Sequence, residues 1–215
     1  MTTIFESSSA PVSALLLEIS AIKLSPSNPF TWSSGWKSPV YCDNRLALSY
    51  PEKRTYIKNE LVKTIQKYFT EAESIAGVAT AGIAQGALVA EQLKLPFLYV
   101  RPKPKDHGMQ NLIEGKIVEG QKVVLIEDLV STGGSSIKAA EALRDAGFNV
   151  IGMAAIFTYG FETAIKNFED AKIPLVCLSD FNHLLTEAIR LKYMDEGQLD
   201  FVAQWRKDPA NWNRS

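Results

Sequence analysis

Hydrophobic residues follow two spacings along the chain, one typical of helices and one typical of buried strands. Short continuous apolar runs predict strands buried on both faces, at residues 75–79, 96–101, 123–126, 150–157 and 175–178. Apolar residues three and four positions apart predict helices at residues 12–22, 51–69, 83–93, 135–146, 162–168, 181–193 and 196–206. Strands that alternate with helices in this way predict an α/β fold with a parallel sheet covered on both faces.

Local signals refine several of these boundaries. Residues 25–40 are rich in Pro, Ser and aromatic side chains and are expected to form a loop or a short hairpin. The sequence from Ser49 to Glu52 fits a capping box, with Pro in the first turn of the helix. Ala81-Gly82 is expected to be a turn, Gly147 to end the helix before it, and residues 102–116 to form a long exposed loop.

The two ends of the chain do not follow the alternation of strands and helices. Residues 1–215 are expected to form a single domain whose core spans about residues 51–180, and residues 1–50 with the C-terminal helices are expected to form a small hood over it. In such sheets, ligands bind at the carboxyl ends of the strands. The loops at 79–83, 101–116 and 127–135 fall at those ends and are expected to line one crevice.

Composition narrows the classes of partner. Of the 215 residues 46% are hydrophobic, which is enough for a buried core, and the net charge of −1 offers no basic field for a nucleic acid. Cys42 and Cys177 show neither metal-ligand spacing nor a disulfide framework and suit a reducing compartment. No signal peptide and no apolar run of membrane-spanning length is seen, so we expect a cytoplasmic protein without a membrane partner.

The most informative segment covers residues 123–135. Four apolar residues lead into Glu127 and Asp128, and the hydroxyl-rich turn from Ser131 to Ser135 precedes a helical pattern. Such a turn offers backbone N–H groups, and the helix adds its positive N-terminal end, so the segment suits a phosphate. Carboxylates suit ribose hydroxyls because they are strong acceptors. The order predicts a site for a ribose with a 5′-phosphate; the alternative is a simple turn with a solvated acid pair.

A second segment, within the long loop, carries Arg101, Lys103, Lys105 and His107. Arg can bind phosphate oxygens through two hydrogen bonds, and Lys supplies a mobile point charge. We interpret the segment as a lid that closes over pyrophosphate; a solvated charge run is the alternative.

Residues 123–135 resemble the phosphoribosyl pyrophosphate (PRPP) signature of type I phosphoribosyltransferases. Together with the sequence from Trp36 to Arg45, which includes Lys-Ser-Pro, and with Lys105-x-His107-Gly108, they make the chain similar to the orotate phosphoribosyltransferase family. The resemblance extends from about Phe30 to the last helices. It implies the type I phosphoribosyltransferase fold, with a central parallel five-stranded sheet flanked by helices and a small hood. It also implies a homodimer that shares its lids between subunits, and Mg²⁺ bound mainly through PRPP rather than by protein ligands.

The implied reaction transfers the 5-phosphoribosyl group from PRPP to orotate and gives orotidine 5′-monophosphate and pyrophosphate, in pyrimidine biosynthesis. Lys105, His107 and Asp128 are the expected catalytic residues. Ser131, by resemblance, and Arg45, by its charge, are expected to bind orotate. The lid and the strand-to-helix segment together are expected to bind PRPP, through Arg101, Lys103, Lys105, His107, Glu127, Asp128, Leu129, Val130, Ser131, Thr132, Gly133, Gly134 and Ser135.

Several positions depart from the pattern of the family, and an Arg expected at Tyr159-Gly160 is missing, a charge that Arg45 could replace. Lysines expected by resemblance are replaced by Ser33, Ala81 and Pro102, and Lys103 is the nearest substitute for the last of these. The alternative functions are a purine or uracil phosphoribosyltransferase of the same fold, and a regulator that retains the sugar-phosphate site without catalysis.

Overall fold

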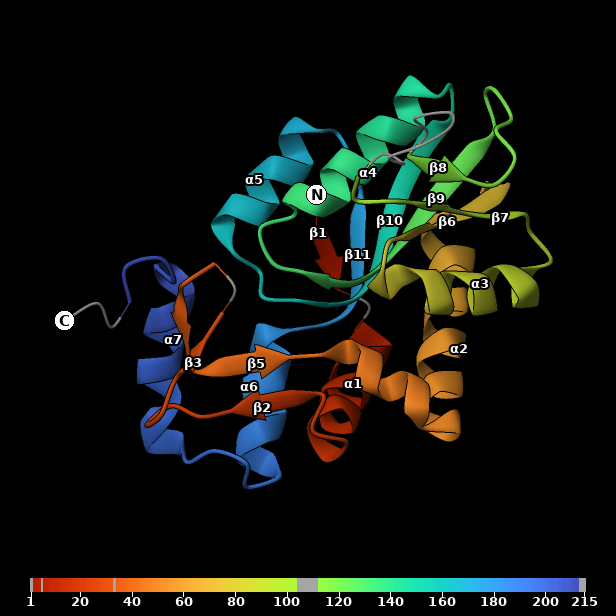
Figure 1. Cartoon of the computed structure of the whole chain (residues 1–215). Helices are drawn as coiled ribbons and strands as arrows, with labels where there is room; N and C mark the ends of the chain where they lie inside the picture. The colour runs from red at the N-terminus through yellow and green to blue at the C-terminus, as the bar shows by residue number, and fades with distance from the viewer. Residues whose placement is uncertain (1, 5, 33, 104–111, 213–215) are drawn as a thin grey trace.

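The computed structural model describes residues 2–4, 6–32, 34–103 and 112–212. Its main sheet has seven strands within these residues (Figure 1). Their order across the sheet is β1 (Thr2–Ile4), β11 (Leu175–Asp180), β10 (Asn149–Thr158), β9 (Lys122–Val130), β6 (Ser74–Val78), β7 (Phe97–Val100) and β8 (Ile113–Glu114). The five expected strands form the parallel centre, which confirms the predicted sheet; β1 adds a parallel edge and β8 an antiparallel one.

Helices cover both faces of this sheet. Figure 1 shows α2 (Pro51–Tyr68) and α3 (Ala81–Leu93) on one face, and α4 (Gly134–Asp145) and α5 (Glu162–Asp170) on the other. Burial on both sides explains why the strands are almost continuously apolar: all five residues of β6 are buried, and residues 123–126 of β9 are inaccessible to solvent. Helix α3 packs so closely on β9 that a Cβ at Gly82 would overlap the carbonyl oxygen of Ile126.

A smaller region lies at the carboxyl ends of the strands. It contains two antiparallel pairs, β2 (Ile22–Leu24) with β5 (Val40–Cys42) and β3 (Phe30–Thr31) with β4 (Lys37–Ser38), and the helices α6 (Phe181–Arg190) and α7 (Leu199–Lys207). The ring of Trp205 in α7 is fully buried 5.5 Å from the ring of Trp32, and its Nε1 donates to the Lys37 carbonyl at 3.1 Å. These contacts join the hairpin near the N-terminus to the last helix.

The N-terminal segment is divided between this region and the sheet. Strand β1, at the start of the chain, pairs with β11, and Ser8 in α1 (Glu6–Glu18) donates to the carbonyl of Leu178 at 3.0 Å. The hairpin expected within residues 25–40 is present as β3 and β4. Among the described residues, no helix is long and apolar enough to cross a membrane.

Several boundaries differ from those expected. Ile22 begins β2 rather than ending the first helix, because α1 stops at Glu18. Ser49 does not cap α2: it ends the 3-10 helix η1 (Asn44–Ser49), and Tyr50 takes the capping position without a side-chain hydrogen bond. Helix α3 already begins at Ala81, and η2 (Glu196–Gln198) precedes α7.

Two of the differences affect the expected loops. Part of the long loop after β7 is the strand β8, and β9 continues past residue 126 to Val130 because β10 pairs with it as far as Thr158. The expected end of α4 is confirmed. Gly147 has a φ of +91°, its N–H donates to the carbonyl of Arg144, and the N–H of Phe148 donates to that of Leu143.

Candidate active site

The acid pair lies inside strand β9. Because side chains alternate along a strand, Glu127 is buried against α4 whereas Asp128 is half-buried on the other side. The Glu127 carboxylate accepts hydrogen bonds from the Ser136 hydroxyl at 2.9 Å and from the Asp128 amide at 3.0 Å. Glu127 is therefore held in the interior of the site, and Asp128 is the more accessible carboxylate.

Burial changes the protonation of both acids. It raises the pKa of Glu127 from 4.5 to about 8, and the neighbouring charge of Asp128 adds to this rise. The hydrogen bond from Ser136 works in the opposite direction, since it favours the ionised carboxylate. Burial also raises the pKa of Asp128, against the hydrogen bond with Glu127 and the charge of Arg45. The pair is thus poorly solvated, and burial favours the protonated form of each carboxyl.

The expected phosphate loop joins β9 to α4. Gly133, the residue before α4, has a φ of +81°, and a Cβ there would come within 2.7 Å of the Phe168 ring in α5. Among the described residues, no acceptor faces the backbone N–H groups of Ser131, Thr132 or Gly133. Free amides that lead into a helix N-terminus form an anion site, so the geometry suits a phosphate. Val130 is fully buried and can offer a ligand only its backbone.

The small region at the carboxyl ends contributes η1 to the site. Asn44 is buried, and its Nδ2 donates to the carbonyl of Asp128 at 2.7 Å. The guanidinium of Arg45 binds both carboxylate oxygens of Asp43 at 2.7 and 3.0 Å, which lowers the pKa of Asp43. The positive charge of Arg45 partly offsets the rise in the pKa of Asp128 that burial causes, so Arg45 acts on the Asp128 side of the pair. Its expected role in orotate binding stays a prediction.

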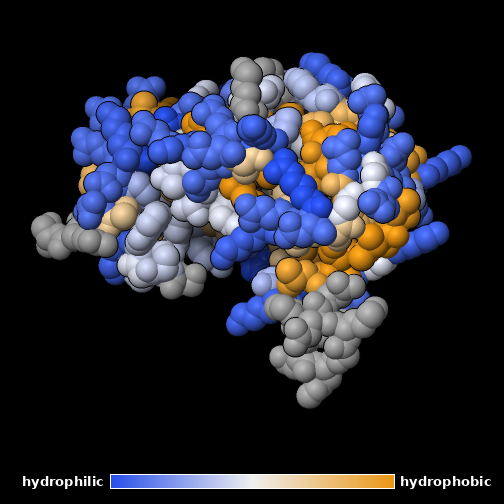
Figure 2. Space-filling model, turned by 90° about the horizontal axis from the view of Figure 1, so that it is seen from above, coloured by the Kyte–Doolittle hydropathy of each residue, from blue (hydrophilic) through white to orange (hydrophobic). Residues whose placement is uncertain are grey.

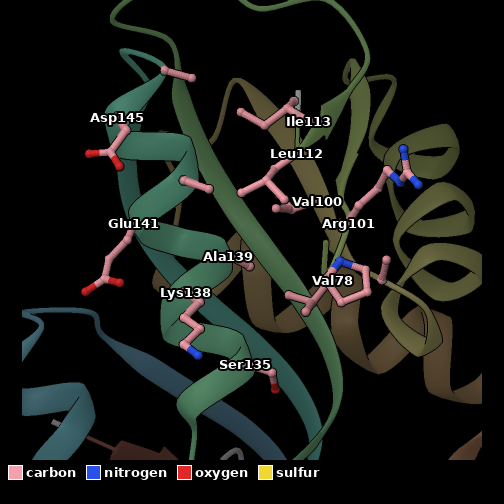
Figure 3. A pocket seen from close by; sticks show the side chains of 14 residues that line it. Val78, Val100, Arg101, Leu112, Ile113, Ser135, Lys138, Ala139, Glu141 and Asp145 are labelled. Atoms are coloured by element: carbon pink, nitrogen blue, oxygen red, sulfur yellow. The ribbon is translucent and has the colours of Figure 1, made fainter. Parts of the chain in front are cut away.

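A pocket of about 740 Å³ lies beside the loop, between α4 and the β7–β8 pair (Figure 3). Each of the three expected loops contributes to its lining, through Ala79, Arg101 and Ser135, whereas residues 127–134 are not part of it. That the loops bind a ligand together stays a prediction. Its floor is apolar: Figure 3 shows Val100 and Leu112 pointing toward α4. The acid pair is not part of this lining.

The ends of the expected lid meet at the edge of this pocket. The Arg101 amide donates to the carbonyl of Leu112 at 2.7 Å, and its guanidinium lies 3.7 Å from the Glu114 carboxylate. Lys103 is exposed. Lys105 and His107 lie outside the described residues, so their catalytic roles stay predictions.

The positions of the missing lysines are partly described. Pro102 is exposed at the pocket, Ala81 is the first residue of α3, and Ser33 lies outside the described residues. Among the described residues, no group of three or more His, Cys, Asp or Glu side chains could hold a metal ion.

Three side chains that the sequence did not single out contact the expected site. They are Asn44 at Asp128, Ser136 at Glu127, and Asn167, whose Nδ2 donates to the carbonyl of Thr132 at 3.0 Å. Ser136 directly follows the expected loop, so its position in the sequence could have indicated that it belongs to the site. Asn167 lies 35 positions from its partner, and nothing in its local sequence indicates the contact.

Comparison with known proteins decides the family. A family model described as a phosphoribosyl transferase domain matches residues 56–183. The orotate phosphoribosyltransferase of Cytophaga hutchinsonii is 55% identical over 203 residues, which cover 94% of this chain and 97% of that protein. The chain belongs to the orotate phosphoribosyltransferase family. The resemblance seen in the sequence is thereby confirmed, and the purine and uracil enzymes of the same fold are set aside.

Solved structures of orotate phosphoribosyltransferases share the fold. The enzyme from Aeropyrum pernix superposes with a TM-score of 0.74 at 28% identity, over 85% of this chain and 99% of that one. The Mycobacterium tuberculosis enzyme in complex with PRPP gives a TM-score of 0.64 at 20% identity, over 81% of this chain and 98% of that one. The latter comparison shows a likeness of fold.

Proposed function

We propose that this chain transfers the 5-phosphoribosyl group of PRPP to orotate, forming orotidine 5′-monophosphate and pyrophosphate in pyrimidine biosynthesis. The observation that carries the proposal is the half-buried Asp128 carboxylate, three residues before the amides of residues 131–133, which have no acceptor among the described residues. A ribose 5-phosphate needs both features: acceptors for the hydroxyl groups of the ribose, and hydrogen-bond donors for the phosphate anion.

The direct test follows the absorbance of orotate in the presence of PRPP and Mg²⁺. Orotate should be consumed only when both are added, and uracil, adenine and hypoxanthine should give no nucleotide. Consumption of one of these bases instead of orotate would overturn the proposal.

In the proposed reaction, orotate N1 attacks C1 of the ribose as the bond to pyrophosphate breaks. The transition state resembles an oxocarbenium ion, as at other glycosidic centres. Negative charge develops on the leaving pyrophosphate, and the positive charges of Arg101, Lys105 and His107, the residues expected from the sequence resemblance, would neutralise it. Asp128 accepts a hydrogen bond from a ribose hydroxyl, and the amides of the loop hold the 5′-phosphate.

The roles at the orotate end follow from charge. Orotate carries a carboxylate, and Arg45 is an exposed guanidinium whose charge acts on Asp128, while Ser131 lies three residues beyond Asp128 in the chain. Because Asp43 already holds Arg45 in two hydrogen bonds, the guanidinium is fixed in place, and its exposed side remains for a second anion.

We propose Mg²⁺ as the cofactor, entering with PRPP. The residues fit this mode, because Mg²⁺ prefers phosphate oxygens and water and needs at most one or two protein carboxylates. Glu127 is buried and held by Ser136, so the half-buried Asp128 is the carboxylate of the pair that could add an oxygen to the ion. When bound, the ion neutralises charge on the pyrophosphate. Chelation with EDTA should abolish turnover, and added Mg²⁺ should restore it.

We further propose a homodimer in which the lid of each subunit serves the active site of the other. Apolar residues support it: Figure 2 shows a hydrophobic area on the side of β7 and β8, and Ile117 and Val118, just beyond β8, are 40% and 38% exposed. Exposed apolar patches of this kind mark interfaces.

Hybrid dimers test this arrangement. Lys105→Ala and Asp128→Asn subunits, each inactive alone, should regain part of the activity when mixed, because one hybrid site then has both intact groups. No recovery in a verified mixed dimer would overturn lid sharing.

A cytoplasmic location is also proposed, since Cys42 and Cys177 are both free thiols.

A further inference from the structure

Side chains from outside the segment hold alternate carbonyl groups of residues 128–132. Each donor comes from a different element, and each bond is short. The three bonds are Asn44 Nδ2 to Asp128 O at 2.7 Å, Thr158 Oγ1 to Val130 O at 3.1 Å, and Asn167 Nδ2 to Thr132 O at 3.0 Å. Each peptide unit is planar, so a hydrogen bond to its carbonyl oxygen also fixes the direction of its N–H group.

In a trans peptide, the carbonyl of one residue points opposite to the N–H of the next. A donor that holds the Thr132 carbonyl therefore turns the N–H of Gly133 away from α5. That N–H has no acceptor among the described residues. It belongs to the free amides that suit a phosphate, so Asn167 determines the direction of an amide that a ligand would use.

The three donors are not equally important. Residues 128 and 130 lie within β9, where pairing with β10 also holds the backbone, and the Val130 carbonyl has a second donor in the Tyr159 amide at 3.3 Å. Thr132 lies beyond the end of β9. Among the described residues, Asn167 is the one donor to its carbonyl.

Helix α5 supports the same turn through a second contact. A Cβ at Gly133 would meet the ring of Phe168, so this ring lies directly beneath the residue with the left-handed φ. Asn167 and Phe168 are consecutive, and together they hold the peptide between Thr132 and Gly133 from one side. On the opposite side of that peptide, the Gly133 N–H has no acceptor within the part of the chain that the structure describes.

We propose that Asn167 is a positioning residue for the phosphate of the sugar substrate: it fixes the Thr132–Gly133 peptide so that the Gly133 amide faces the 5′-phosphate. Asn167 does not touch the ligand. It acts by removing the freedom of the loop before binding, which lowers the cost of binding. The inference rests on the proposed function only in taking this loop as the phosphate site.

The test measures binding of two ligands to Asn167→Leu and to the wild-type protein by calorimetry. Ribose 5-phosphate probes the loop, and pyrophosphate probes the other end of the site. A misdirected amide loses a hydrogen bond to a charged group, so the dissociation constant for ribose 5-phosphate should rise about tenfold. The constant for pyrophosphate should stay within about twofold of wild type. In turnover, the KM for PRPP should rise more than the KM for orotate.

Thr158→Val is the matched control. It removes a hydrogen bond to a carbonyl two residues upstream, where the Tyr159 amide still donates. Its ribose 5-phosphate affinity should stay close to wild type even if its thermal stability falls. Asn167→Ala, which leaves less bulk next to the loop, replaces Asn167→Leu if the latter does not fold.

Three results would overturn the inference: unchanged ribose 5-phosphate affinity in a folded Asn167 variant, equal weakening of both ligands, or equal weakening in the Thr158 control. Failure of the proposed function is seen separately, as a wild-type protein that binds ribose 5-phosphate but does not convert orotate.

Discussion

Glu127 makes the stability of this protein depend on pH, and replacing it by glutamine should remove that dependence. The side chain is 5% exposed, and burial together with the charge of Asp128 raises its pKa from 4.5 to about 8. The folded protein therefore holds this proton more tightly than the unfolded chain. The resulting stabilisation is complete below about pH 4.5 and is lost as the pH rises through about 8.

The structure sets the size of the effect. One pKa unit corresponds to about 1.4 kcal/mol, so the rise from 4.5 to about 8 gives at most about 5 kcal/mol. The hydrogen bonds from Ser136 and the Asp128 amide favour the ionised form, and the value of about 8 already includes their opposing effect. We expect the difference in unfolding free energy between wild type and Glu127→Gln to change by about 2 to 4 kcal/mol between about pH 5 and about pH 9, in favour of the variant at high pH.

Urea unfolding at several pH values measures this difference. Glu141→Gln, at an exposed position on the neighbouring helix α4, controls for the exchange of a glutamate for glutamine. Parallel stability curves for wild type and Glu127→Gln, within about 0.5 kcal/mol from about pH 5 to about pH 9, would refute the argument that burial controls this carboxyl.

Three further variants test the site. Gly133→Ala should weaken PRPP binding, and unchanged affinity would contradict the loop assignment. Its left-handed φ alone should lower the free energy of unfolding in urea by about 1 to 2 kcal/mol, and the overlap with Phe168 should lower it further. Arg45→Ala should raise the KM for orotate about tenfold and leave that for PRPP nearly unchanged, whereas an unchanged orotate KM would exclude the guanidinium from the base site. Lys105→Ala should lose most of kcat while ribose 5-phosphate still binds in calorimetry, and near-normal turnover would remove its role in the lid.

The order of the elements could be predicted from the sequence because the parallel strands are apolar runs. The five central strands needed only local pattern, as in residues 123–126, whose side chains are all inaccessible. The edge strands could not be found in the same way. Strand β1 is defined by its pairing with β11, more than 170 positions away, and its three residues carry no pattern of their own.

The predicted ends of strands and helices were wrong where contacts with another element outweighed the local secondary-structure preference. Glu127 and Asp128 suggest the end of a strand, yet β10 pairs with β9 as far as Val130 and extends it through both acids. Ser49 has the residue type and spacing of a helix cap, but Asp43, which accepts from the Arg45 amide, starts the 3-10 helix that occupies this position. In both places, tertiary contacts outweigh a propensity that is worth about 1 kcal/mol.

The residues of the site also fall into two groups, those that a local sequence pattern indicates and those that only tertiary contacts bring to the site. The groups expected to touch the ribose and its 5′-phosphate lie in one continuous segment, because a strand followed by a glycine-rich turn and a helix carries the donors of an anion site in consecutive residues. Groups that support that segment come from elsewhere: Asn44 lies 84 positions before Asp128, and Asn167 lies 35 positions after Thr132. Each support is a single amide whose partner is a backbone carbonyl, and a carbonyl has no side-chain identity that a sequence could display. A local motif therefore reveals where the ligand binds, whereas the residues that hold the motif in shape become visible only when the chain is folded.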